Sequence, residues 1–122
     1  MELISIKNSI PKELYEILEK EITKLRPAQE KAIKQGLLSG KNLLVCTPTA
    51  SGKTLIAELA ALKSIIEGKG KTVYIVPLKA LASEKYKDFK RRYDKIAKIA
   101  LSIGGIDSTD LYLADYDIIL VT

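Results

Sequence analysis

One segment of the sequence combines the residue types that bind a triphosphate. Thr47-Pro-Thr-Ala-Ser-Gly-Lys-Thr54 ends in Gly-Lys-Thr after four spacer residues, although Thr47 stands where the strict phosphate-loop pattern has glycine. Gly52 would let backbone amides approach phosphate oxygens, because glycine has no Cβ in the way. Lys53 would reach the β- and γ-phosphates, and the Thr54 hydroxyl would bind Mg²⁺. The segment therefore predicts a phosphate-binding loop.

The residues on either side predict the elements that position this loop. Before it, the continuous apolar run Asn42–Cys46 is typical of a short strand that is buried on both faces of a sheet. We expect Cys46 to be a small buried strand residue and not a nucleophile. After the loop, the apolar spacing predicts a helix over about 53–67, whose first turn would offer free N–H groups and the positive end of a dipole. A Gly-Lys-Thr loop that merely turns the chain is the structural alternative, and this context disfavours it.

The remaining pattern alternates strands with helices. Two helices are expected before the loop and one basic helix after it, and three further strands follow the loop. In chain order these are helices over Ile10–Glu21 and from Pro27 to a stop near Gly36–Gly40, a strand over Thr72–Val76, a helix over about Leu81–Tyr93, and strands over Lys98–Ser102 and Asp117–Val121. Parallel strands need crossover connections, so we predict an α/β fold with a parallel sheet and helices on both faces.

Composition excludes several kinds of chemistry. The 122 residues contain no histidine and one cysteine, which removes Ser-His and Cys-His catalysis and internal disulfides. Twenty basic residues against fifteen acidic ones give a net charge of +5, which favours a polyanionic partner. No apolar run approaches the roughly 18 residues of a membrane span, and the N-terminus has no secretory signal pattern. We therefore expect a soluble, cytoplasmic protein without a membrane partner.

The segments that flank the loop carry a family resemblance. Leu25-Arg-Pro-Ala-Gln29 resembles the Q motif of superfamily 2 helicases, and the loop itself resembles their motif I. Val76-Pro-Leu-Lys-Ala-Leu-Ala82 resembles motif Ia, and Ile103-Gly-Gly105 resembles the glycine motif that follows it. The similarity is greatest to the superkiller-like branch, especially the archaeal Hjm-type DNA helicases. It implies that residues 1–122 form the N-terminal part of a first RecA-like, ATP-binding domain.

The resemblance implies a role for each matching residue. Gln29 would bind the adenine edge and select ATP over GTP, and Thr54 would ligate Mg²⁺. The triphosphate would be wrapped by the whole loop, which consists of Thr47, Pro48, Thr49, Ala50, Ser51, Gly52, Lys53 and Thr54, with Lys53 and Thr54 as the catalytic members. The nucleic-acid strand would contact Pro77, Lys79, Gly104, Gly105 and Thr122, with Lys79 on a backbone phosphate.

Two parts of a complete helicase are missing from these residues. The sequence lacks an Asp-Glu-x-His box and the second RecA-like domain, which supplies the arginine finger. We therefore expect this chain to bind ATP and Mg²⁺ without hydrolysing ATP or unwinding DNA alone. The implied partners are single-stranded or branched DNA, with RNA not excluded, and the second RecA-like domain. A sheet with an exposed edge would also favour self-association.

Two questions stay open at the level of sequence. The segment Lys79–Lys98 has eight basic and three acidic residues, which fits either a phosphate-binding surface or a solvated helix face. Its aromatic residues Tyr86, Phe89 and Tyr93 recur at helical spacing and are expected to face the core. Function has two alternatives, a stand-alone nucleotide-dependent binding module and a P-loop kinase. The kinase is the weaker one, because neither an arginine-bearing lid nor an acceptor site is apparent.

Overall fold

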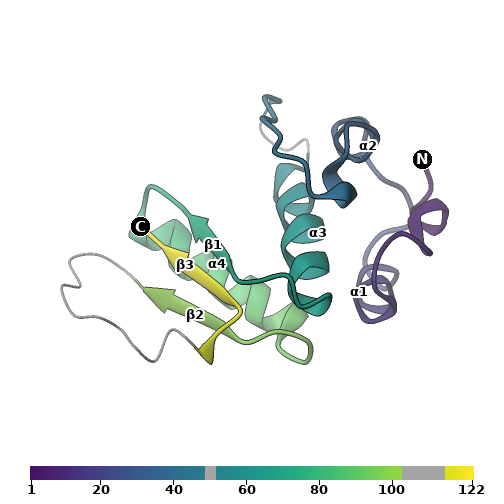
Figure 1. The fold of residues 1–122 in the computed structure, drawn as a ribbon. Coiled ribbons are helices and arrows are strands. Elements are labelled where there is room, and N and C mark those ends of the chain that lie inside the picture. The colour runs from purple at the N-terminus through teal and green to yellow at the C-terminus, as the bar shows by residue number, and fades with distance from the viewer. Residues whose placement is uncertain (49–51, 103–114) are drawn as a thin grey trace. The chain divides into compact units, whose positions relative to one another are not determined.

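The computed structural model describes residues 1–48, 52–102 and 115–122 (Figure 1). These residues form two units, Met1–Lys63 and Ser64–Thr122, and each has its own core. The first unit holds the phosphate-loop segment, and the second holds the sheet. None of the helices in the described part of the chain is long and apolar enough to cross a bilayer.

The first unit is helical. It contains the short 3-10 helices η1 (Leu3–Ile6) and η2 (Leu37–Ser39), the helices α1 (Lys12–Leu18) and α2 (Pro27–Lys34), and most of α3 (Lys53–Ile66). Two buried leucines four residues apart on α1, Leu14 and Leu18, contribute to its core. All three predicted helices of this part exist, although α1 is shorter than expected at both ends.

The N-terminus fixes the approach of the chain to α2. Glu2 and Lys24 form an isolated antiparallel bridge. Beside it the Leu3 N–H donates to the Thr23 carbonyl at 2.9 Å, and the Leu25 N–H donates to the Met1 carbonyl at 2.8 Å. The segment directly before Pro27 is therefore held by backbone hydrogen bonds, which sets the point at which α2 begins.

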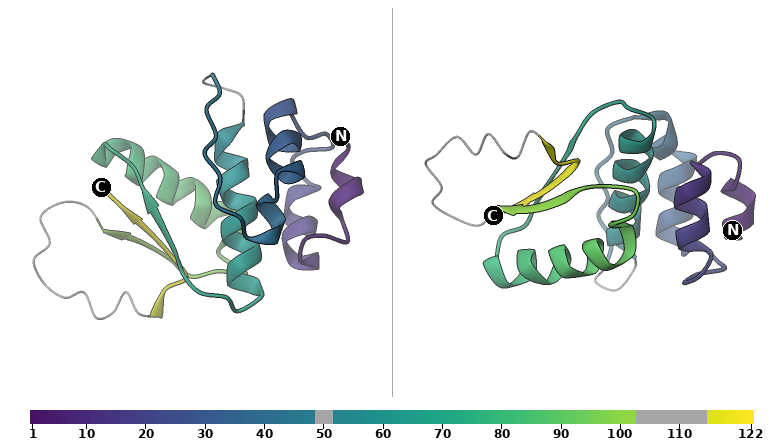
Figure 2. Two further views of the ribbon diagram at one scale, coloured as in Figure 1. Left: turned by 45° about the horizontal axis from the view of Figure 1, so that its top comes forward. Right: turned by 90° about the horizontal axis from the view of Figure 1, so that it is seen from below.

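The second unit is a three-stranded parallel sheet covered by a helix (Figures 1 and 2). Its strands are β1 (Thr72–Ile75), β2 (Ile99–Ser102) and β3 (Ile118–Val121), in the order β1-β3-β2, and both pairs are parallel. Helix α4 (Lys79–Tyr93) packs on one face, where the rings of Tyr74 and Phe89 meet edge to face at 5.2 Å. The predicted parallel α/β architecture is confirmed.

The other face of β1 is open. Val73 and Ile75 alternate with the covered residues of β1 and are 59% and 74% exposed. In the parallel register these two side chains stand beside Ile119 and Val121 of β3. Strand β1 is also an edge strand, which matches the expectation of an exposed apolar edge.

The prediction of a strand over Asn42–Cys46 is wrong. Residues 41–48 form no strand, Leu44 is 90% exposed, and the Cys46 thiol is exposed and not buried. An apolar run is consistent with a strand, but a strand exists only where a neighbour accepts and donates its backbone hydrogen bonds. No strand in residues 1–48, 52–102 and 115–122 pairs with this segment. The sheet accordingly has three strands in this part of the chain, where the sequence predicted four.

Replacing Leu120 tests which face of the sheet carries the core. Leu120 is fully buried beneath α4, so Leu120→Ala should destabilise the chain by about 2–5 kcal/mol. The control is Val73→Ala on the open face, which should cost less than about 1 kcal/mol. The free energy of unfolding from denaturant titration measures both, and equal losses would contradict the assignment of the two faces.

Candidate nucleotide and nucleic-acid sites

The start of α2 positions Gln29 through the sequence Arg-Pro-Ala-Gln. Pro27 occupies the first helical position, where its missing N–H costs no helical hydrogen bond. Arg26 is the extended N-cap residue, and Gln29, at the third helical position, reaches back so that its Oε1 accepts the Arg26 N–H at 2.8 Å. The Gln29 side chain is only 4% exposed. The local helix start therefore holds one end of this amide in place.

The other end of the same amide binds the phosphate-loop segment. Gln29 Nε2 donates to the Gly52 carbonyl at 3.1 Å. Gly52 has a φ of +86°, in the left-handed region, and a Cβ on it would collide with Gln29 Nε2. Glycine is therefore required at this position for two reasons, its backbone conformation and the close approach of Gln29.

Lys53 contacts the first residue of the predicted loop. It is the first residue of α3, and its Nζ donates to the Thr47 carbonyl at 3.0 Å. Thr54 follows in the first turn of α3 and is half-buried, as is Thr47, whereas Pro48 is exposed. The structure thus brings Gln29, Gly52, Lys53 and Thr47 together. The predicted loop residues Thr49, Ala50 and Ser51 lie outside the described residues.

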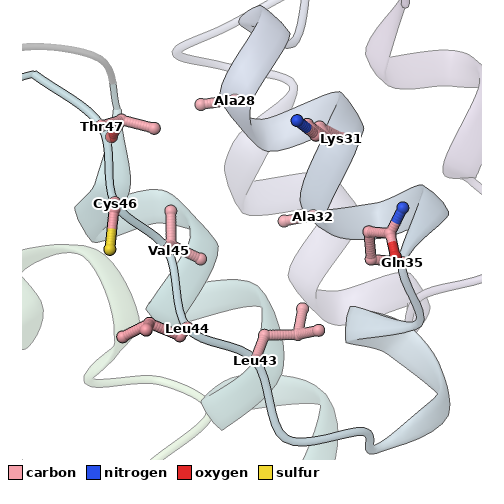
Figure 3. Close-up of a pocket in the computed structure, with 9 residues that line it drawn as sticks. All are labelled: Ala28, Lys31, Ala32, Gln35, Leu43, Leu44, Val45, Cys46 and Thr47. Atoms are coloured by element: carbon pink, nitrogen blue, oxygen red, sulfur yellow. The ribbon is translucent and has the colours of Figure 1, made fainter.

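Two hollows adjoin these residues. One of about 450 Å³ is lined by Arg26, Pro27, Ala28, Lys31, Thr47 and Pro48. The other, of about 280 Å³, lies between α2 and residues 43–47 (Figure 3). In Figure 3, Leu43 and Val45 point toward α2, whereas Leu44 and Cys46 point away from it. The segment therefore has the alternation of an extended chain, although it pairs with no strand among the residues that the structure describes.

Lys31 is the site residue that sequence reasoning missed. It lines both hollows from the face of α2 that also carries Ala28. A single lysine on a helix has no motif to mark it. The only available signal was its spacing of three residues from Ala28, which places both on one helical face.

The predicted nucleic-acid residues of the second unit gather at one edge of the sheet. Pro77 follows β1, Lys79 begins α4, and Thr122 follows β3, and all three are exposed. The Val76 N–H donates to the Val121 carbonyl at 2.9 Å, which joins the carboxyl ends of the two strands. Open α/β sheets bind ligands at this edge. Gly104 and Gly105 lie outside the described residues.

The basic helix α4 buries most of its aromatic residues. Phe89 and Tyr93 are buried, as expected. Tyr86 is half-buried and lies under the Lys90 ammonium, which is 5.5 Å from the ring centroid and 3.3 Å from the phenolic oxygen. The hydrogen bond from Lys90 to Tyr86 raises the pKa of Lys90 above its usual value. This lysine is therefore cationic throughout the physiological range.

Known structures share this fold. The chain superimposes on the DUF1998 helicase MrfA bound to DNA with a TM-score of 0.77 and 26% identity, covering 93% of this chain and 17% of that one. MrfA without DNA gives a TM-score of 0.75 and 28% identity, covering 93% of this chain and 19% of that one.

Two curated sequence relatives share about half of their aligned residues with this chain. The chain is 56% identical over 107 residues to the ATP-dependent DNA helicase Hel308 of Methanocella arvoryzae, covering 83% of this chain and 14% of that protein. It is 50% identical over 115 residues to Hel308 of Pyrococcus abyssi, covering 93% of this chain and 16% of that protein. The chain thus spans about one-sixth of the length of these curated relatives. The DEAD/DEAH box helicase family model matches residues 26–122, from the N-cap of α2 to the end of β3, and the chain belongs to this family.

Proposed function

We propose that residues 1–122 are the N-terminal part of the first RecA-like domain of an ATP-dependent DNA helicase, and that they bind ATP with Mg²⁺ and a DNA strand. The relatives that share about half of its residues are named ATP-dependent DNA helicases, and one structural neighbour is bound to DNA. The observation that carries the nucleotide proposal is the Gln29–Gly52 hydrogen bond, because it ties a base-reading amide to the phosphate loop.

Gln29 selects adenine because its amide has a fixed orientation. Turning the amide over would set Oε1 against the Gly52 carbonyl and Nε2 against the Arg26 N–H, and both hydrogen bonds would be lost. In the held orientation these two hydrogen bonds leave one Nε2 hydrogen and one Oε1 lone pair unused. These match the N7 acceptor and the N6 donor of adenine, whereas guanine presents a second acceptor, O6. ATP is therefore preferred over GTP.

The phosphates bind where α3 begins. The helix N-terminus contributes unpaired N–H groups and a positive dipole end. Lys53 Nζ now holds the Thr47 carbonyl, and it exchanges this neutral acceptor for a charged phosphate oxygen when the nucleotide enters. Thr54 supplies the hydroxyl for Mg²⁺, an ion that neutralises charge on the phosphates when bound.

The DNA strand binds at the carboxyl edge of β1 and β3. Lys79 supplies an exposed cation at the start of α4, and the Thr122 hydroxyl stands at the end of the neighbouring strand. Such contacts address the phosphate backbone and carry no sequence information. The 122 residues contain no Asp-Glu pair, so the group that positions the attacking water is not among them. We therefore propose that the chain by itself binds ATP and does not turn it over.

Removing the Lys53 cation tests the phosphate loop. Lys53→Ala should weaken ATP binding by about 1.5–3 kcal/mol, because a charge-assisted hydrogen bond to phosphate is lost. Calorimetric titration with Mg-ATP measures the change. Lys12→Ala is the control, since it removes the same charge from a side chain that is 83% exposed in α1. Unchanged affinity in Lys53→Ala would refute the phosphate-loop assignment.

Removing the Lys79 cation tests the nucleic-acid edge. Lys79→Ala should weaken binding of single-stranded DNA to a similar extent whatever its sequence, and should lower the salt slope by about 0.7. Fluorescence anisotropy at several salt concentrations, with two unrelated strand sequences, gives both quantities. A loss confined to one sequence would contradict a backbone contact.

A further inference from the structure

Helix α4 carries a row of exposed cations along one side, which we call the lysine stripe: Lys79, Lys87 and Lys90. The positions follow the spacing i, i+8 and i+11, which returns to the same side of an α-helix. All three residues are exposed. Ser83 completes the row with a small side chain. At 1.5 Å per residue the stripe is about 16 Å long.

Neither acidic residue of α4 forms an ion pair with a lysine of the stripe in the described part of the chain, although Glu84 and Asp88 line one hollow together with Lys87. Helix α4 contains six basic residues and two acidic ones, Glu84 and Asp88. The Asp88 carboxylate accepts hydrogen bonds from two arginines that lie outside the stripe, Arg91 at 3.0 Å and Arg92 at 2.7 Å. Burial raises the pKa of Asp88, but the hydrogen bond from Arg91 and the charge of Arg92 outweigh it, so the pKa is lowered and the carboxylate is charged. No ion pair to Lys79 or Lys87 is formed within residues 1–48, 52–102 and 115–122.

The stripe offers charge without a stacking surface. A single backbone contact, such as the one proposed for Lys79, needs no stacking, but surfaces that bind a run of single-stranded nucleotides combine cations with exposed aromatic rings on which bases stack. The three aromatic residues of α4 do not serve this purpose, because Phe89 and Tyr93 are buried and Lys90 lies over the ring of Tyr86. A duplex needs no stacking partner, and it presents one negative charge per about 1.7 Å of its axis. The chemistry of the stripe therefore matches a duplex backbone better than an open strand.

We propose that the lysine stripe of α4 binds the phosphate backbone of double-stranded DNA, as a continuation of the single-strand contact at Lys79. The stripe spans about five base pairs of one duplex strand, at 3.4 Å each. Its contacts are independent of sequence, since they reach phosphates and no base edges. This inference rests on the proposed function, because it assigns a second form of the same DNA partner to the surface next to the proposed strand site.

The test compares duplex and single-stranded DNA with the complete 122-residue chain. The double variant Lys87→Ala/Lys90→Ala leaves Lys79 in place, and alanine keeps the helix propensity of α4. By fluorescence anisotropy at about 0.1 M salt, duplex affinity should fall about tenfold or more, and the salt slope should decrease by about 1.8. Affinity for the single strand should change less than about threefold. Circular dichroism confirms that the helix is retained.

The matched control is Lys69→Ala/Lys85→Ala, which removes two lysines of the same unit that lie off the stripe. It should leave the duplex affinity close to that of the unchanged chain. Equal losses of duplex affinity in the two double variants, or equal losses of affinity for duplex and single strand, would overturn the assignment of the lysine stripe to duplex DNA. If Lys79→Ala weakens single-strand binding while Lys87→Ala/Lys90→Ala leaves duplex binding intact, the inference fails and the proposed function stands. If Lys79→Ala has no effect on single-strand binding, the proposed strand site fails instead.

Discussion

The proposed nucleotide site depends on the two hydrogen bonds that the Gln29 side-chain amide forms. Its oxygen accepts from the backbone of the residue that starts α2, and its nitrogen donates to the carbonyl of Gly52. A buried amide must satisfy its donors and acceptors, and these two bonds satisfy one of each. The phosphate loop is thereby attached to α2 at the residue that immediately precedes Lys53. In the proposed function, one connected set of groups recognises both the base and the triphosphate.

The second unit follows a different constraint, which is the register of its parallel strands. Pairing Ile75 with Val121 brings the residues that follow β1 and β3 to the same edge of the sheet. Pro77, Lys79 and Thr122 follow these strands, so they belong to one edge although Thr122 is far from the other two in the sequence. Because α4 begins at that edge, its exposed lysines lead away from it along one side of the helix. A short sheet and one helix thus present both the proposed strand site and the lysine stripe.

Sequence patterns predicted the elements that are locally encoded. Pro27 predicted the start of α2, Gly52 predicted the residue before α3, and runs of β-branched residues predicted the strands. Each of these elements lies near its predicted position. The prediction of a buried strand over Asn42–Cys46 was wrong, because a strand needs a neighbouring strand to pair with, and a local sequence pattern carries no information about that neighbour. The Gln29–Gly52 contact joins residues 23 positions apart, so no local signal could reveal it. The family and the fold are confirmed, whereas the roles of Gln29, Lys53, Lys79 and the loop residues stay predictions.

The most direct measurement of the central claim is a pair of calorimetric titrations, with Mg-ATP and with Mg-GTP, on the chain and on Gln29→Ala. Asn8→Ala is the control, because it removes a side-chain amide from an exposed position between η1 and α1, away from both hollows. We expect ATP to bind more tightly than GTP by about 1–3 kcal/mol, Gln29→Ala to abolish this difference, and Asn8→Ala to retain it. Equal binding of ATP and GTP by the unchanged chain, or a preference that survives in Gln29→Ala, would contradict the role proposed for Gln29.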